Sequence, residues 1–278
     1  MDQQTPHRVL NNGVTIPQLG FGTYKVEPAD AVRVVSEALE IGYRHVDTAQ
    51  MYGNEREVGQ AVRESGLPRE DVFVTTKLNN NQLTYDDALA SFDRSLDDLG
   101  LDFVDLFLIH WPLPTVSDFV PRWKALEEIY RSGRARAIGV SNFQENHLVR
   151  LMEETQIVPA VNQVEIHPYL VQDELRGFDA KHGIVTQAWS PLGRGAVLGD
   201  PTIAAIARRH GASPAQVIIR WHVQRGDVVF PKASSRARIE ENFRALELHL
   251  ADEDMTAITA LDRGERTGSH PDTMAWIP

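Results

Sequence analysis

One unit recurs eight times along this chain: a short apolar run typical of a buried strand, a polar loop, and an amphipathic segment with helical periodicity. The apolar runs cover residues 19–22, 43–46, 72–76, 103–109, 135–140, 160–164, 184–189 and 228–230. The helical segments cover residues 28–41, 54–65, 84–99, 119–132, 144–155 and 171–182, then 201–210 with 214–225, and 236–246 with 252–261. Near-continuously apolar strands that alternate with helices indicate a parallel sheet covered by helices.

Eight such units in roughly 250 residues match a closed (β/α)8 barrel, the TIM barrel. Before the first unit, Asn12-Gly13 predicts a two-residue turn in a β-hairpin over residues 8–18. We therefore expect an α/β chain folded as a (β/α)8 TIM barrel with an N-terminal hairpin and extra C-terminal helices. No linker interrupts the pattern, so we expect residues 1–278 to form a single domain.

The main alternative is a doubly wound open sheet, which usually carries a glycine-rich phosphate fingerprint after its first strand. Here Lys25 stands where the third glycine of that fingerprint is needed. A second glycine pair, at residues 193 and 195, is followed by Gly199 one residue late and lies deep in the C-terminal half. Both matches are weak, because glycine pairs are common in tight loops for steric reasons alone.

Composition excludes several classes of function. The net charge of -11 argues against nucleic-acid binding, which needs a basic face. The chain has no cysteine, so disulfides, thiolate nucleophiles and cysteine-ligated metals are excluded. It has no HExxH and no GxxxxGK[ST] motif, and we expect no metal site. The N-terminus lacks a signal-peptide apolar region and no run reaches the ~20 apolar residues of a membrane span, so we expect a cytoplasmic protein.

Polar and aromatic side chains follow nearly every predicted strand, at the barrel end where chemistry gathers. In chain order they are Tyr24, Asp47 with Tyr52, Lys77, His110 with Trp111, Ser141 with Asn142, Gln163, Trp189 with Ser190, and Lys232. Each has an ordinary explanation on its own: an ion pair at the rim, a packed aromatic ring, a core histidine or a helix cap. Together they predict an active site assembled from several strand ends.

Four of these side chains fit one chemical scheme. The Tyr52 hydroxyl has an ordinary pKa of about 10 and is a poor acid at neutral pH. A nearby Lys77 ammonium would lower that pKa, and Asp47 would keep the lysine charged and fixed. His110 could donate to an oxygen that becomes negative. The set suits protonation of an alkoxide formed when a carbonyl accepts hydride, and it is poorly suited to hydrolysis.

The later strand ends fit a nicotinamide cofactor. Trp189 offers a flat face for stacking, and Ser141, Asn142 and Gln163 offer groups suited to a carboxamide. The loop over residues 190–195 follows the seventh strand, where barrels often bind phosphate. A basic cluster follows the eighth strand and comprises Lys232, Ser234, Ser235, Arg236 and Arg238. A 2′-phosphate at this helix N-terminus would favour NADPH over NADH; the alternative is a solvated helix face paired with Glu240 and Glu241.

At this point the sequence resembles the aldo-keto reductase family over almost its whole length. The motifs that carry the resemblance are GYRHVDTAQMYGNEREVG at residues 42–59, then TTKL, LIHWP, IGVSNF, NQVEIHP, WSPLGRG and FPKASSRARIEENF. Their number and order are specific to the family, and the sequence is most similar to its short bacterial members, such as the 2,5-diketo-D-gluconic acid reductases.

The resemblance implies a (β/α)8 barrel that binds NADPH without a Rossmann fold. It implies the catalytic residues Asp47, Tyr52, Lys77 and His110 and the substrate-pocket residues Tyr24, Trp111 and His110. It also implies the cofactor contacts Ser141, Asn142, Gln163, Trp189, Ser190, Leu192, Gly193, Lys232, Ser234, Arg238, Glu241 and Asn242. Ala233 stands where many relatives carry serine, which weakens the expected 2′-phosphate site, and Tyr24 replaces a common tryptophan.

The sequence therefore predicts a monomeric NADPH-dependent carbonyl reductase whose partners are small carbonyl compounds. Two rival interpretations stay open. The same site could oxidise an alcohol with NADP⁺, or the barrel could be a non-enzymatic binding protein, which usually loses a catalytic group. The connection over residues 112–121 and the tail over residues 262–278 are short, so we expect an open pocket. Acid recognition needs a cation at its mouth, and the sequence alone places none there.

Overall fold

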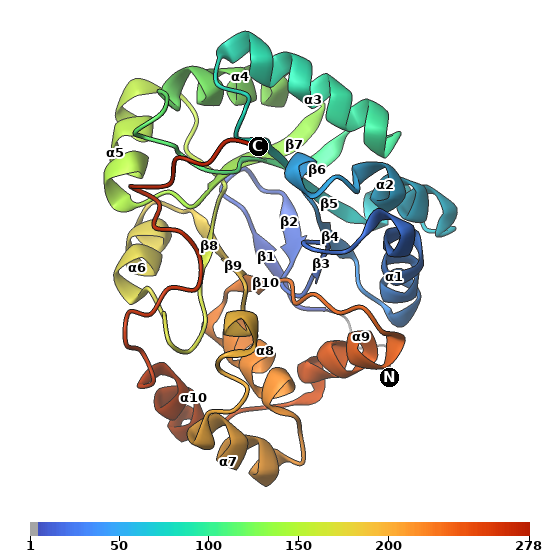
Figure 1. Cartoon of the computed structure of the whole chain (residues 1–278), viewed down its shortest axis with the longest axis vertical. Coiled ribbons are helices and arrows are strands. Elements are labelled where there is room, and N and C mark those ends of the chain that lie inside the picture. The colour runs from blue at the N-terminus through green and yellow to red at the C-terminus, as the bar shows by residue number, and fades with distance from the viewer. Residues whose placement is uncertain (1–4) are drawn as a thin grey trace.

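Eight parallel strands form the centre of the computed structural model, which describes residues 5–278 (Figure 1). In order around the sheet they are β3 (Phe21–Gly22), β4 (His45–Asp47), β5 (Phe73–Leu78), β6 (Val104–Ile109), β7 (Ala135–Ser141), β8 (Val161–Glu165), β9 (Val185–Trp189) and β10 (Val228–Val229). A parallel bridge between Leu19 and Val229 joins the first strand to the last. The Gly20 amide donates to the Val229 carbonyl at 2.8 Å, and the Val229 amide donates to the Gln18 carbonyl at 2.7 Å. The predicted barrel is confirmed.

Helices surround the strands, as the alternating pattern predicts (Figure 1). They are α1 (Pro28–Ile41), α2 (Glu55–Glu64), α3 (Tyr85–Leu99), α4 (Val120–Arg131), α5 (Glu145–Glu154), α6 (Asp173–Lys181), α7 (Pro201–His210), α8 (Pro214–Arg225), α9 (Arg236–Phe243) and α10 (Asp252–Thr259). Three short 3-10 turns were not predicted: η1 (Gln50–Tyr52), η2 (Arg69–Asp71) and η3 (Gly193–Gly195). A fourth, η4 (Arg244–Glu247), follows α9 where the prediction gave one helix over residues 236–246. Strand ends differ from the prediction by one or two residues, so Lys77 and Ser141 lie within β5 and β7 rather than after them.

The N-terminal hairpin covers the end of the barrel opposite the predicted site. Strands β1 (His7–Val9) and β2 (Thr15–Pro17) pair antiparallel, and Leu10 and Ile16 pack in one apolar cluster with side chains of β5 to β10. The Leu10 amide donates to the Val14 carbonyl, so the turn holds three residues rather than the predicted two. Gly13 occupies the left-handed conformation that this turn requires, with φ 85°.

The C-terminal tail follows α10 and runs back along one side of the barrel, past α6 and α5, drawn in dark red in Figure 1. It carries no regular helix or strand from residue 262 onward. No described helix is long and apolar enough to cross a bilayer.

Candidate active site

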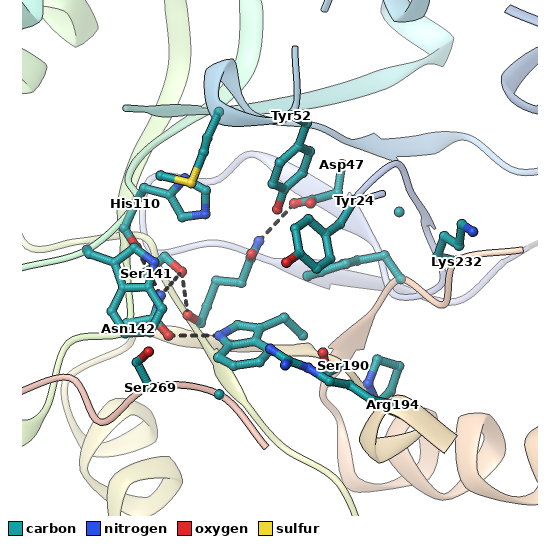
Figure 2. Close-up of a pocket in the computed structure, with 18 of the residues that line it drawn as sticks. Tyr24, Asp47, Tyr52, His110, Ser141, Asn142, Ser190, Arg194, Lys232 and Ser269 are labelled. Carbon is teal, nitrogen blue, oxygen red and sulfur yellow. Dashed lines mark hydrogen bonds between the residues drawn. The ribbon is translucent and has the colours of Figure 1, made fainter. Parts of the chain in front are cut away.

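A cavity with an empty volume of about 1030 Å³, counting space open to solvent, lies at the C-terminal ends of the strands (Figure 2). Its lining includes most of the predicted site: Tyr24, Asp47, Tyr52, His110, Trp111, Ser141, Asn142, Gln163, Trp189, Ser190 and Lys232. It also includes residues that sequence reasoning missed: Gly22, Met51, Pro191, Arg194, Phe230, Gly268, Ser269, Met274 and Trp276. Residues far apart in the chain therefore meet in one concave site, as expected of a barrel enzyme.

A rigid loop presents Tyr52 to this cavity. Gly53 turns the chain after η1 with φ 65°, a left-handed conformation that favours glycine. The buried Asn54 amide donates to the carbonyls of Thr23 and Val26 at 3.1 and 3.0 Å, and its oxygen accepts from the Thr48 hydroxyl at 2.9 Å. These bonds tie the loop that carries Tyr52 to the loop after β3.

Lys77 forms the centre of the charged group at the floor of the cavity. Its Nζ donates to Asp47 Oδ1 at 2.6 Å and to the Thr48 carbonyl at 2.8 Å, and it lies 3.4 Å from Tyr52 Oη. Asp47 and Lys77 are buried, and Gln163 Nε2 donates to the second Asp47 oxygen at 2.8 Å. Every polar atom of the carboxylate therefore has a partner, which is what a buried ion pair needs.

His110 follows β6 and lies on the other side of Tyr52. The two rings meet edge to face, with centroids 5.8 Å apart and planes at 75°. Tyr24 packs against the same phenol, with centroids 5.2 Å apart. The structure therefore brings together all four residues proposed for the chemistry. Figure 2 labels three of them, Asp47, Tyr52 and His110.

Burial sets the protonation states of Tyr52 and His110. It raises the pKa of Tyr52 well above 10, with Asp47 and Tyr24 adding to the effect. Burial also lowers the pKa of His110 well below 6.5, so the imidazole is neutral near pH 7. The expectation that Lys77 would lower the pKa of Tyr52 is wrong for this pocket, because the cost of burying a phenolate exceeds the attraction of the ammonium. At neutral pH Tyr52 is therefore a protonated phenol.

Asn142 holds the indole of Trp189. Its backbone is left-handed, with φ 65°. Its side-chain Nδ2 donates to the His110 carbonyl at 2.9 Å and to Ser141 Oγ at 3.0 Å. Its oxygen accepts from Trp189 Nε1 at 2.8 Å. Within the protein, the Asn142 side chain is thus engaged in fixing a ring that lines the cavity.

Some of the predicted cofactor contacts lie outside the cavity lining. Leu192, Gly193, Ser234, Arg238, Glu241 and Asn242 do not line it, and Asn242 is buried. Arg236 pairs with Glu40 and Glu240. Lys232 and Arg238 are exposed, and neither forms an ion pair with a carboxylate within residues 5–278. The alternative of a fully paired helix face therefore holds for Arg236 alone.

The C-terminal tail forms one wall of the cavity. Gly268, Ser269, Met274 and Trp276 contribute to that wall, and Asn80 Nδ2 donates to the Trp276 carbonyl at 3.0 Å. Arg194 reaches the cavity from the loop after β9 and supplies a cation that sequence reasoning did not place (Figure 2). The WSPLGRG motif could have indicated Arg194, whereas the tail has no periodicity that predicts its path.

Comparisons with known proteins identify the family of this chain. The model of the Aldo/keto reductase family matches residues 18–263. An aldo-keto reductase of Mycolicibacterium smegmatis is 51% identical and covers 97% of this chain and 98% of its own. A glyoxal reductase of Bacillus subtilis is 46% identical and covers 95% of this chain and 96% of its own. The crystal structure of a Gox0644 mutant in complex with NADPH superposes with a TM-score of 0.94 at 42% identity, covering 98% of this chain and 99% of that one. The chain belongs to the aldo/keto reductase family.

Proposed function

We propose that this protein reduces aldehydes or ketones to alcohols with NADPH, and that Tyr52 donates the proton. Membership of the family makes it an oxidoreductase that acts on carbonyl groups. The observation that carries the assignment of roles is the contact of Tyr52 Oη with Lys77 Nζ at 3.4 Å, with Asp47 2.6 Å behind the lysine.

The residues present fit NADPH. Trp189 is fixed by Asn142 and lines the cavity, so its ring is available for stacking against a flat heterocycle. Ser141, Gln163 and Ser190 line the same cavity and are suited to amide and phosphate groups. Lys232 and Arg238 are cations without carboxylate partners in the described chain; Lys232 precedes α9 and Arg238 lies in its first turn. When bound, NADPH would supply the hydride.

The protein's own residues would move and stabilise the proton. Tyr52, held as a neutral phenol, donates its proton to the carbonyl oxygen as that oxygen gains negative charge. Lys77 then stabilises the phenolate that remains, and Asp47 with Gln163 fixes the lysine in place. His110 stands beside the phenol and orients the carbonyl. These groups are preorganised, so little reorganisation accompanies the reaction.

The test of the proton donor is Tyr52→Phe, which deletes only the hydroxyl. We expect kcat to fall by ~10²–10⁴-fold, the usual contribution of a general acid, with NADPH affinity nearly unchanged. Steady-state kinetics with a reactive dicarbonyl and quenching of NADPH fluorescence measure the two quantities. Tyr130→Phe on α4, outside the cavity, is the matched control. A Tyr52→Phe protein that kept most of its kcat would refute the role.

Within this function we propose substrates that carry an acidic group beside a reactive carbonyl, such as diketo sugar acids, ahead of neutral dicarbonyls. Arg194 is exposed, lines the cavity, and forms no ion pair within residues 5–278, so its guanidinium is free to pair with a substrate carboxylate. Tyr24, Trp111 and Met274 supply apolar walls of the same cavity.

Arg194→Gln separates the two substrate classes. We expect kcat/KM for glyoxylate to fall by roughly tenfold, as for one charge-assisted hydrogen bond, with kcat/KM for methylglyoxal nearly unchanged. The KM for NADPH is measured in parallel, because a contact of Arg194 with the cofactor would raise it. Equal losses for glyoxylate and methylglyoxal would contradict the proposed acid preference.

A further inference from the structure

Glu165 is a buried carboxylate that the proposed chemistry does not use. It ends β8, two residues after Gln163, and its side chain is fully buried. Its partners come from the C-terminal tail, about a hundred residues away. The Thr267 amide donates to Oε1 at 2.7 Å, the Thr267 hydroxyl donates to the same oxygen, and the Gly268 amide donates to Oε2 at 3.1 Å.

These donors explain why the residue is a glutamate. His167 Nε2 lies 3.2 Å from Oε1 and adds a fourth donor. Burial alone would raise the pKa of Glu165, but the bonds from His167 and Thr267 hold that pKa below its ordinary value. A carboxylate is an acceptor only, so it suits a site at which donors alone converge. A glutamine would turn its own NH₂ group toward one of them.

The hydrogen bonds from Thr267 and Gly268 to Glu165 form a clamp between the tail and β8. Gly268 connects this clamp to Trp189. Glu165 and Trp189 are directly paired residues of β8 and β9. A Cβ built on Gly268 would lie 2.4 Å from Trp189 Cη2 and 3.3 Å from Cζ3, so the glycine backbone lies directly against the outer edge of the indole. The opposite edge of the ring donates from Nε1 to Asn142 at 2.8 Å. The indole is therefore held at both edges, by Asn142 and by Gly268.

A second set of hydrogen bonds, through Gln172, also links the tail to Glu165. Gln172 Nε2 donates to the Glu165 carbonyl at 2.7 Å, and Arg266 donates to Gln172 Oε1 at 3.3 Å. Several hydrogen bonds thus link the tail, at residues just before Gly268, to the end of β8. The part of the tail beyond Gly268 lines the cavity.

We propose that Glu165 is a positioning residue for the reduction: by fixing Thr267 and Gly268, it keeps the Trp189 indole in the orientation that receives the nicotinamide. This inference rests on the proposed function, since it assigns Trp189 to the cofactor. Glu165 itself does not contact the reacting atoms.

The first test is Glu165→Gln, with Glu265→Gln in the same tail as the control, because Glu265 is exposed and, among residues 5–278, pairs only with Arg263. We expect Glu165→Gln to weaken NADPH binding and lower kcat/KM by about tenfold, the effect of losing one charge-assisted bond. Glu265→Gln should match the parent. Thr267→Val, which deletes one donor and leaves the carboxylate, serves if Glu165→Gln does not fold. Parent-like NADPH affinity in both Glu165→Gln and Thr267→Val would overturn the proposal.

The second test asks whether the effect passes through the indole. Gly268→Ala is made in the parent and in Trp189→Phe, whose smaller ring lacks the contacted edge. We expect Gly268→Ala to weaken NADPH binding severalfold in the parent and far less in Trp189→Phe, which is the coupling a contact predicts. Equal effects in the two backgrounds would overturn the proposed path. Gly177→Ala in α6 is the control for the added methyl group, because a Cβ there meets no atom of the described residues within 4 Å.

A cofactor-free measurement separates this inference from the proposed function. The emission of Trp189 is obtained without NADPH as the difference between each protein and its Trp189→Phe counterpart. We expect this emission to shift in Glu165→Gln and Gly268→Ala and to stay unchanged in both controls. An unshifted emission would overturn the clamp. A parent protein that neither binds nor oxidises NADPH would refute the proposed function, while the emission shift would still test the clamp.

Discussion

At the scale of single residues, the role of a charged side chain in this barrel depends on whether its charge is already paired within the protein. Lys77 is buried and has Asp47, Thr48 and Tyr52 around it, so its charge is held in one place. The Arg236 guanidinium forms ion pairs with Glu40 and Glu240. Lys232 and Arg238 differ from both, because neither forms an ion pair in the part of the chain that the structure describes.

That difference predicts cofactor preference. We expect Lys232→Ala or Arg238→Ala to raise KM for NADPH by roughly tenfold, since a charge-assisted phosphate contact is lost, and to leave KM for NADH nearly unchanged. Arg236→Ala is the matched control and should have a smaller effect, because its charge is already neutralised. Initial rates with both cofactors measure the ratio. Equal increases in KM for NADPH and NADH would contradict a 2′-phosphate site.

At the scale of elements, α6 packs on β8 and β9 through a buried carboxylate. Asp179 accepts from the Thr186 hydroxyl at 3.0 Å and from Asn162 Nδ2 at 3.3 Å. Burial raises the pKa of Asp179 from 3.8 to about 7, and the two hydrogen bonds only partly offset it. The folded protein therefore binds more protons than the unfolded chain between about pH 4 and 7, and its free energy of unfolding falls as pH rises through that range.

Asp179→Asn should remove this dependence. At about 1.4 kcal/mol per pKa unit, we expect the variant to be more stable than the parent by a few kcal/mol at pH 8 and similar to it near pH 4. Urea unfolding at several pH values provides the free energies. Glu174→Gln, at an exposed position of the same helix, controls for the loss of charge alone. A parent and an Asp179→Asn variant with parallel stability–pH curves would show that Asp179 is not responsible.

At the scale of the whole molecule, closure of the sheet joins the first strand–helix unit of the chain to the last. Gln18 Nε2 donates to the carbonyls of Val223 and Asp227 at 3.2 and 3.1 Å, and Leu19 bridges to Val229. Neither half of such a barrel completes its sheet alone. We propose that residues 1–278 form one domain and that the protein is a monomer.

The single-domain proposal predicts one cooperative unfolding transition. We expect far-UV circular dichroism and tryptophan fluorescence to give the same urea midpoint, and sedimentation to give a species of about 31.2 kDa. Two separated midpoints, each from one half of the chain, would contradict the single domain, and a heavier species would contradict the monomer.

The sequence by itself determined the eight strand–helix units, the hairpin and the strand ends that carry Asp47, Lys77 and His110. It could do so because strand and helix periodicities are local, and because a parallel barrel brings all its strand ends to one rim. Only the tertiary structure decided the high pKa of Tyr52, the absence of a carboxylate partner for Lys232 within residues 5–278, and the wall formed by the tail. Burial and contacts between residues a hundred positions apart produce these features, and no local pattern encodes either.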